Sequence, residues 1–203
     1  MCNVIVIGAG GHAKVVADIV IKSGDRLLGF LDDCKQGAVL DGYSVIGKIT
    51  EAEKFSKDAR FIVAIGNNEV RRTLMERLGL QWYTAVHPSA QLGIGAQIGE
   101  GSCVAATAVI NADAAVGKGC IINTAAVVEH DCVVGDFSHV SPGGVLCGTV
   151  KVGSCVHVGA NATVINNLLV CDNSVIGAGA TVTKNIKEGG VYVGTPAKLI
   201  GEK

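Results

Sequence analysis

One apolar residue recurs at every sixth position through the second half of the chain. From Val86 to Val182 each such position holds Val, Ile or Leu, and the fourth residue after it is usually small. A six-residue unit supplies one short strand and one turn, so it buries its apolar side chain only by stacking on its neighbours. Three units close a triangular coil, which predicts a parallel β-helix whose residues 18 apart stack at roughly 4.8 Å. The periodic residues are Val86, Leu92, Ile98, Val104, Ile110, Val116, Ile122, Val128, Val134, Val140, Leu146, Val152, Val158, Val164, Val170, Ile176 and Val182.

Composition narrows the classes of partner. The net charge of −1 argues against nucleic acid or an anionic membrane, both of which attract basic surfaces. The uncharged stretch from Val152 to Cys171 keeps the hexad pattern and contains polar residues, so no membrane insertion is expected. The N-terminus lacks the basic start of a signal peptide, which favours a cytoplasmic protein. The eight cysteines form no Cys-x-x-Cys pair, and those within the repeat are never 18 apart, which predicts buried, reduced thiols.

Residues 1–84 lack the hexad and alternate apolar strand patterns with helical ones. This alternation predicts a parallel sheet in a small α/β domain resembling half of a Rossmann fold. The β-helix is expected over residues 85–186, followed by a C-terminal tail over residues 187–203. The expected N-terminal elements are strands at Val4–Ile7, Leu27–Leu31 and Phe61–Ile65, and helices at Lys14–Lys22 and Glu69–Leu78, the second capped by Asn67 or Asn68.

The N-terminal domain carries a glycine turn suited to phosphate. Gly8 to Ala13 fits G-x-G-x-x-A, whose backbone amides and following helix can cradle an anion. His12 and Lys14 lie just inside the helix start, and Asp32 and Asp33 follow the second strand, at the edge where open parallel sheets bind ligands. Together they favour a nucleotide or nucleotide-sugar over a dinucleotide. A solvated helix start, a plain turn and an NAD site remain the alternatives.

Histidines are not needed to pack a coil of Val, Ala and Gly. His130 lies between Glu129 and Asp131, and a neighbouring carboxylate can orient an imidazole and stabilise its protonated form, as a general base requires. His139 and His157 are 18 apart and should stack. His130 and His139 are half a coil apart, so they can serve one site only if that site lies between two subunits.

The whole chain resembles the hexapeptide-repeat acyltransferases, which fold as left-handed β-helices. It is similar above all to the branch that acetylates sugars, including the UDP-amino-sugar N-acetyltransferases of bacillosamine synthesis and the sialate O-acetyltransferases. The motifs that carry the resemblance are Gly8–Lys14, Asp32-Asp33, Gly66-Asn67, Ile122–Thr124, Glu129–Asp131, Ser138–Ser141 and Gly194–Lys198.

The resemblance implies a homotrimer with its active sites between adjacent β-helices, acetyl-CoA as the donor and no metal. It implies that His130 is the general base, supported by Asp131 where the bacillosamine-type relatives have Glu. Asn123 and His139 would line the acceptor pocket, and the Gly148 amide would hold the thioester oxygen.

The resemblance also implies the two substrate sites. Ala160 and Ala178 match positions that contact pantetheine, and the C-terminal tail would contribute to CoA binding. The resemblance assigns binding of the acceptor's nucleotide to a set of N-terminal residues: His12, Lys14, Asp32, Asp33, Gly66 and Asn67.

Several functions remain open at this point. The favoured one is N-acetylation of a UDP-linked 4-amino-4,6-dideoxy sugar. A GDP- or dTDP-linked amino sugar and a sialate-type O-acetylation are the enzymatic alternatives, and a nucleotide-binding scaffold without catalysis is the non-enzymatic one.

Overall fold

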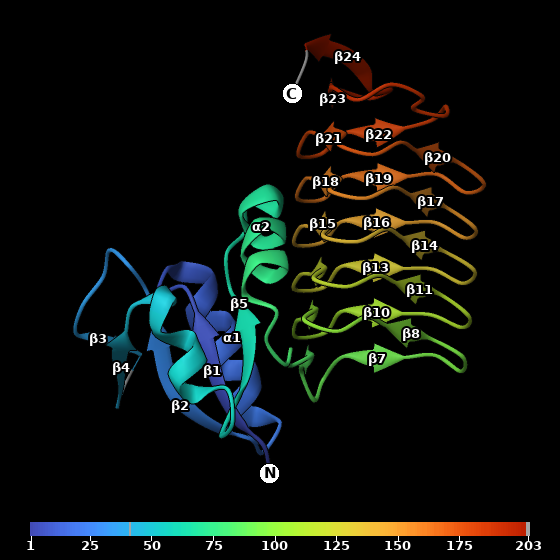
Figure 1. Cartoon of the computed structure of the whole chain (residues 1–203). Helices are drawn as coiled ribbons and strands as arrows, with labels where there is room; N and C mark the ends of the chain where they lie inside the picture. Colours follow the sequence, from blue (N-terminus) through green and yellow to red (C-terminus); the bar gives the residue numbers. More distant parts are fainter. Residues whose placement is uncertain (41, 202–203) are drawn as a thin grey trace.

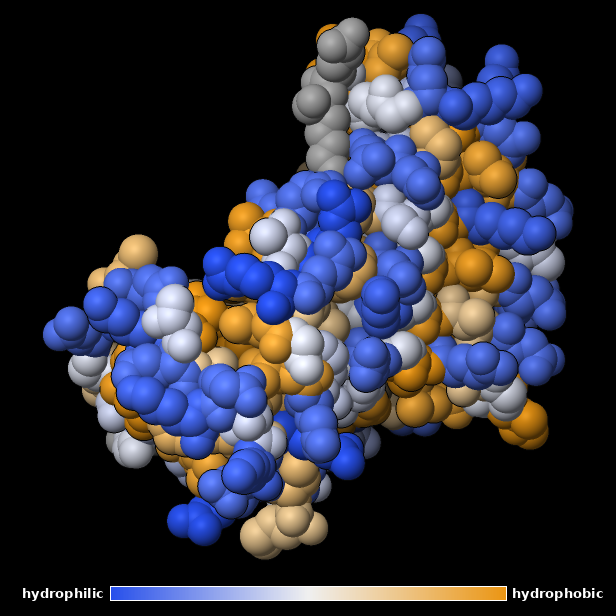
Figure 2. All heavy atoms as spheres, in the orientation of Figure 1, coloured by the Kyte–Doolittle hydropathy of each residue, from blue (hydrophilic) through white to orange (hydrophobic). Residues whose placement is uncertain are grey.

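The computed structural model describes residues 1–40 and 42–201. An α/β domain precedes a column of stacked coils, and it lies beside the lower coils of that column (Figure 1). The space-filling view shows the upper part of the column standing free of this domain (Figure 2). Within the described residues, no helix is long and apolar enough to cross a bilayer.

The α/β domain is built on a sheet with strand order β3-β4-β2-β1-β5. Strand β1 (Asn3–Ile7) lies between β2 (Arg26–Leu31) and β5 (Arg60–Val63) and pairs in parallel with both, and α1 (Gly11–Lys22) connects β1 to β2. The elements expected from the sequence are present, each displaced at its ends by no more than a few residues. The hairpin of β3 (Ala38–Leu40) and β4 (Tyr43–Gly47) and the 3-10 helix η1 (Ile49–Phe55) were not predicted, because they lack a clear apolar period.

The second helix, α2 (Asn68–Leu78), follows β5 and leads to the β-helix. Asn67 is its N-cap, because the Asn67 side chain accepts a hydrogen bond from the Val70 amide at 3.0 Å. Gly79 ends it in a left-handed conformation at φ 56°, which a residue without Cβ adopts at little cost. Leu74 and Met75 on its buried side pack with Phe137 and Cys155 of the β-helix.

The repeat region folds into the predicted parallel β-helix. Each short strand ends on one of the periodic residues, and each residue pairs with the one 18 positions later, as His139 does with His157. The strands are β6 (Ala85–Val86), β7 (Gln91–Leu92), β8 (Gln97–Ile98), β9 (Cys103–Val104), β10 (Val109–Ile110), β11 (Ala115–Val116), β12 (Ile121–Ile122), β13 (Val127–Val128), β14 (Val133–Val134), β15 (His139–Val140), β16 (Val145–Leu146), β17 (Lys151–Val152), β18 (His157–Val158), β19 (Thr163–Val164), β20 (Leu169–Val170), β21 (Val175–Ile176) and β22 (Thr181–Val182).

These strands form three sheets, and the chain passes through them in the same order in every coil. Sheet I contains β6, β9, β12, β15, β18 and β21, sheet II runs from β7 to β22, and sheet III runs from β8 to β20. The periodic side chains and the small residues four positions later form the buried interior. The segment after β22 adds β23 (Val191–Val193) and β24 (Lys198–Gly201) to the end of sheet I.

From β7 to β22, every corner between two sheets contains one residue in the left-handed region. Such a residue pays a steric cost of roughly 1 kcal/mol unless it is Gly, Asn or Asp, so corners favour these types. In chain order these residues are Gly95, Gly101, Thr107, Asp113, Gly119, Ala125, Asp131, Phe137, Gly143, Thr149, Cys155, Asn161, Asn167, Asn173 and Gly179.

The cysteines are free thiols, as the sequence predicts. Cys103, Cys120, Cys132 and Cys155 are buried, and burial raises the pKa of the Cys120 thiol to about 12. The expectation of burial is wrong for Cys34, which is exposed in the turn after β2.

The α/β domain covers the outer face of sheet I. Ala85, Cys103, Ile121 and His139, which stack on this face, are all buried. Ala85 and Cys103 belong to the same apolar cluster as the buried side of α1. The cover ends above His139, so the next residue of the stack, His157, is only partly buried.

Candidate active site

His130 lies at the corner between sheets II and III, after β13. Its Nδ1 is 2.8 Å from the Asp131 carboxylate, and both side chains are more than half exposed. The hydrogen bond to Asp131 is the main cause that raises the pKa of His130, and the charges of Asp131 and Glu129 add to it. Because Nδ1–H donates to the carboxylate, the neutral ring carries its lone pair on Nε2, the atom that a general base uses.

Asp131 occupies the left-handed position of this corner, at φ 59°. Aspartate tolerates that conformation better than a long or branched side chain does. The same corner therefore explains both the residue type and the contact, since the short side chain reaches the ring of the residue before it.

Gly148 lies one coil above His130, on the same corner. A Cβ at this position would be 2.6 Å from His130 Nε2, so only glycine leaves the ring in place. Within the described part of the chain, the Gly148 N–H makes no hydrogen bond, whereas the N–H of the next residue, Thr149, donates to the His130 carbonyl. A free backbone donor therefore accompanies the imidazole, which is the arrangement that an oxyanion site needs.

His139 on sheet I has the opposite environment. The Asn123 Oδ1 accepts from the Thr124 amide at 2.8 Å, which turns Asn123 Nδ2 toward His139 Nε2 at 3.1 Å. Nε2 therefore accepts, and the His139 proton lies on Nδ1. Desolvation, assisted by nearby His157 and Arg71, lowers the pKa of His139 to about 3, so its ring is neutral at physiological pH.

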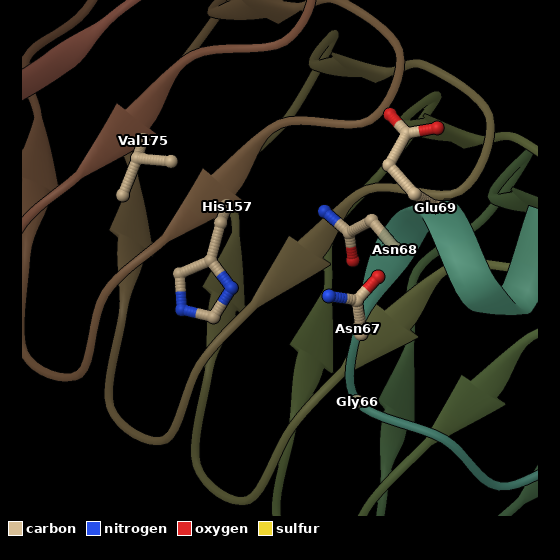
Figure 3. Close-up of a pocket in the computed structure, with 6 residues that line it drawn as sticks. All are labelled: Gly66, Asn67, Asn68, Glu69, His157 and Val175. Carbon is tan, nitrogen blue, oxygen red and sulfur yellow. The ribbon is translucent and has the colours of Figure 1, made fainter. Parts of the chain in front are cut away.

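A pocket of about 320 Å³ opens where the cover of sheet I ends. Gly66, Asn67 and Glu69 at the start of α2 form one side, and His157 and Val175 of sheet I form the other (Figure 3). The His157 ring packs edge-on to His139, with 4.9 Å between the ring centroids. Two predicted acceptor residues, Gly66 and Asn67, therefore lie beside the histidine stack.

The predicted nucleotide residues of the α/β domain surround its glycine turn. Asp32 accepts hydrogen bonds from the Ala9, Cys34 and Lys35 amides at 2.8 to 2.9 Å. Desolvation acts to raise the pKa of Asp32, but these amide bonds outweigh it and the net pKa is lowered. Asp33 accepts from the Ile49 amide. Both carboxylates thus shape the main chain of the loops at this edge of the sheet.

The other residues of this group differ in exposure. Lys14 is exposed, whereas His12 is partly buried, and desolvation followed by the charge of Arg71 lowers the pKa of His12 to about 4. Asp32 and Asp33 also line a pocket of about 350 Å³ bounded by β4 and the start of η1.

The strand order separates the predicted catalytic residues within one chain. His130, Asp131 and Gly148 lie at the corner between sheets II and III, because they follow β13 and β16. The other predicted residues lie on sheet I or at the corner between sheets I and II: Asn123, His139, Ala160 and Ala178. Ala160 and Ala178 are in adjacent coils, as the Gly179 N–H bond to the Ala160 carbonyl shows. One chain alone does not bring the two groups together.

The sequence did not predict that Asn68, a candidate N-cap, and Arg71 are buried between α2 and the β-helix. The available signal was a charged residue on the apolar stripe of α2, in register with Leu74 and Met75. Within the described residues, no group of three or more His, Cys, Asp or Glu side chains is arranged to hold a metal.

Comparisons with known proteins match both parts of the chain. Residues 3–78 match the PglD N-terminal domain family. The acetyltransferase domain of PglB from Neisseria gonorrhoeae is 38% identical, with a TM-score of 0.94, over 98% of this chain and 100% of that one. PerB from Caulobacter crescentus, solved in complex with CoA and GDP-perosamine, is 36% identical with a TM-score of 0.93, over 98% of this chain and 97% of that one.

A curated relative adds a sequence match. The UDP-N-acetylbacillosamine N-acetyltransferase of Bacillus subtilis is 41% identical over 115 residues, which are 52% of this chain and 52% of that protein. The match therefore spans about half of the length of this relative.

Proposed function

The chain belongs to the PglD-type hexapeptide-repeat sugar N-acetyltransferases, and we propose that it transfers the acetyl group of acetyl-CoA to the amine of a nucleotide-linked 4-amino sugar. The observation that carries the proposal is the corner at His130. There an exposed imidazole is oriented by Asp131 and lies against the unpaired Gly148 N–H.

The proposed reaction is a direct attack of the amine on the thioester. The amine nitrogen forms a bond to the acetyl carbon, and the bond from that carbon to the CoA sulfur breaks. His130 Nε2 takes the proton that the nitrogen loses and returns it to the leaving thiolate. Asp131 stabilises the imidazolium formed in between, and the Gly148 N–H donates to the developing oxyanion.

The α/β domain is proposed to bind the nucleotide of the acceptor. The backbone of the turn from Gly8 to Ala13 and the start of α1 offer donors for phosphate, and the pocket beside Asp32 and Asp33 lies at the same edge of the sheet. We favour UDP, which the name of the Bacillus relative carries. GDP, which PerB binds as GDP-perosamine, is the second candidate.

We propose that the active enzyme is a homotrimer with its sites between chains. His130 of one chain would face Asn123 and His139 of its neighbour, because a single chain separates them. Pantetheine would run past Ala160 and Ala178, and the described part of the predicted C-terminal tail, residues 187–201, would contribute to CoA binding; residues 202–203 of that tail lie outside the described residues. Mixing His130→Ala with Asn123→Ala subunits tests this arrangement, since hybrid trimers would regain intact sites. Hybrids without recovered activity would place each site within one chain.

An acceptor screen tests the activity itself. The full-length protein is incubated with acetyl-CoA and UDP-, GDP- or dTDP-linked 4-amino sugars, alongside sialic acid as a hydroxyl acceptor, and thiol release is measured. We expect the UDP-linked amine to react fastest. Transfer to the hydroxyl alone would make the protein an O-acetyltransferase, and the absence of any transfer would favour a nucleotide-binding scaffold.

The role of the α/β domain is tested with Asp32→Ala. Without its carboxylate the glycine turn loses the bond to the Ala9 amide, so KM for the nucleotide-sugar should rise about tenfold while KM for acetyl-CoA changes little, the signature of lost uniform binding. Asp18→Ala, at an exposed ion pair on α1, is the matched control. Saturable NAD binding without any response to a nucleotide-sugar would overturn this assignment.

A further inference from the structure

Arg71 is a fully buried cation that has no carboxylate partner within the described residues. Its guanidinium instead donates to main-chain carbonyls on two sides. Nε and Nη2 donate to the carbonyls of Gly119 and Phe137 at 2.6 and 2.8 Å, and Nη1 donates to the carbonyls of Ile65 and Gly66 at 2.9 and 3.3 Å. The side chain therefore joins the β-helix to the segment that leads into α2.

The two β-helix carbonyls have a special place in the coils. Gly119 and Phe137 are the left-handed residues of successive corners between sheets III and I. The N–H of such a corner residue bonds to the neighbouring coil, as when Phe137 donates to the Lys118 carbonyl. The carbonyls of Gly119 and Phe137, in contrast, accept none of the described backbone hydrogen bonds. A corner covered by another domain must receive its donors from that domain, since a buried unpaired carbonyl is costly. Arg71 supplies them for two coils at once.

Asn68 continues the contact by one coil. Its Nδ2 donates to the Val156 carbonyl at 3.0 Å, while its Oδ1 accepts from Arg71 Nη2 at 2.8 Å. Together the two side chains fix the position of the start of α2 along the axis of the β-helix, because they bind three successive coils. That start carries Gly66 and Asn67, which line the pocket beside His157.

We propose that Arg71 is a positioning residue for the acceptor: it fixes the loop at Gly66 and Asn67 at one height on the β-helix, and so sets where the amine is presented for transfer. This inference rests on the proposed function. Lysine cannot replace the fork, because one ammonium group cannot reach two corner carbonyls and two loop carbonyls in a single plane. The guanidinium stays charged at neutral pH although desolvation lowers the pKa of Arg71 to about 10.

Arg71→Lys in the assembled full-length enzyme tests the inference. Arg77→Lys, at an exposed position of the same helix, is the matched control. We expect Arg71→Lys to lower kcat/KM for the nucleotide-sugar by about tenfold to a hundredfold, the effect of a small misplacement, with KM for acetyl-CoA unchanged. Hydrogen exchange of the amides at residues 65–68 should become faster, while exchange in the coils above His157 stays the same. The control should alter none of these values.

Two results would overturn the inference. One is an Arg71→Lys enzyme with the kinetics and loop exchange of the control. The other is an equal loss for both substrates with faster exchange throughout the β-helix, which marks a general loss of stability. If the wild-type protein acetylates no amino sugar, the proposed function fails. The exchange at residues 65–68 then still decides whether Arg71 fixes the loop.

Discussion

Two histidines only nine residues apart have opposite surroundings. His130 is exposed at a corner beside two carboxylates, and its pKa is raised, chiefly by the hydrogen bond to Asp131. His139 is buried on the face of sheet I beneath the α/β domain, and desolvation lowers its pKa to about 3. The same repeat thus yields one imidazole with a raised pKa and one that is neutral at physiological pH, and the α/β domain buries only the second.

The largest expected effect is on catalysis and distinguishes His130 from His139. His130→Ala should lower kcat by roughly 10²- to 10⁴-fold, the usual contribution of a positioned general base. CoA affinity, measured by calorimetry, should change little, because His130 acts on the proton of the acceptor. A variant with near-wild-type kcat at saturating substrate would remove His130 from this role.

Gly148→Ala tests the packing around the exposed imidazole. The added Cβ would displace the ring from its place beside Asp131, since it would lie 2.6 Å from Nε2. We expect kcat to fall about tenfold to a hundredfold. Combined with His130→Ala, the same substitution should cost much less, because the ring it displaces is gone. Fully additive losses would show that Gly148 acts independently of His130.

Asp131→Asn tests the carboxylate that raises the pKa of His130. The base is inactive when protonated, so wild-type kcat/KM falls as the pH drops through this raised pKa. Asparagine suits the left-handed position at φ 59° but carries no charge, so the acid limb of the profile should move to lower pH. The rate at high pH should fall about threefold to tenfold, because a weaker base transfers the proton less well. An unmoved acid limb would assign it to another group.

The smallest expected effect concerns His139, the buried histidine of the compared pair. His139 stays neutral in the folded protein but gains a proton in the unfolded chain below pH 6.5, so stability is lost as the pH falls toward the folded pKa of about 3. His139→Asn should remove about 1 kcal/mol of the stability lost between pH 6.5 and 5.5, measured by denaturant unfolding at several pH values. His87→Asn, a partly exposed position, is the control. An unchanged pH dependence would show that His139 is not the group responsible.

Sequence reasoning reached far in the repeat and less far in the domain before it. The hexad located every strand of the coil, and the pairing of His139 with His157 followed from a separation of 18. In the α/β domain the strand and helix patterns were visible, but the β3-β4 hairpin was not, since a short exposed hairpin has no apolar period. The candidate base was visible because a histidine between two acids has no packing role in such a coil.

The sequence by itself determined the coil, because one buried residue in six leaves the chain a single way to bury its apolar side chains. It also determined the contact of His130 with Asp131, because the two are adjacent. Only the tertiary structure decided which histidine is buried and how Arg71 joins the domains. Which histidine is buried depends on how far the α/β domain covers the outer face of sheet I. The Arg71 guanidinium binds carbonyls 48 and 66 positions further along the chain, and contacts between such distant residues leave no periodic signal in the sequence.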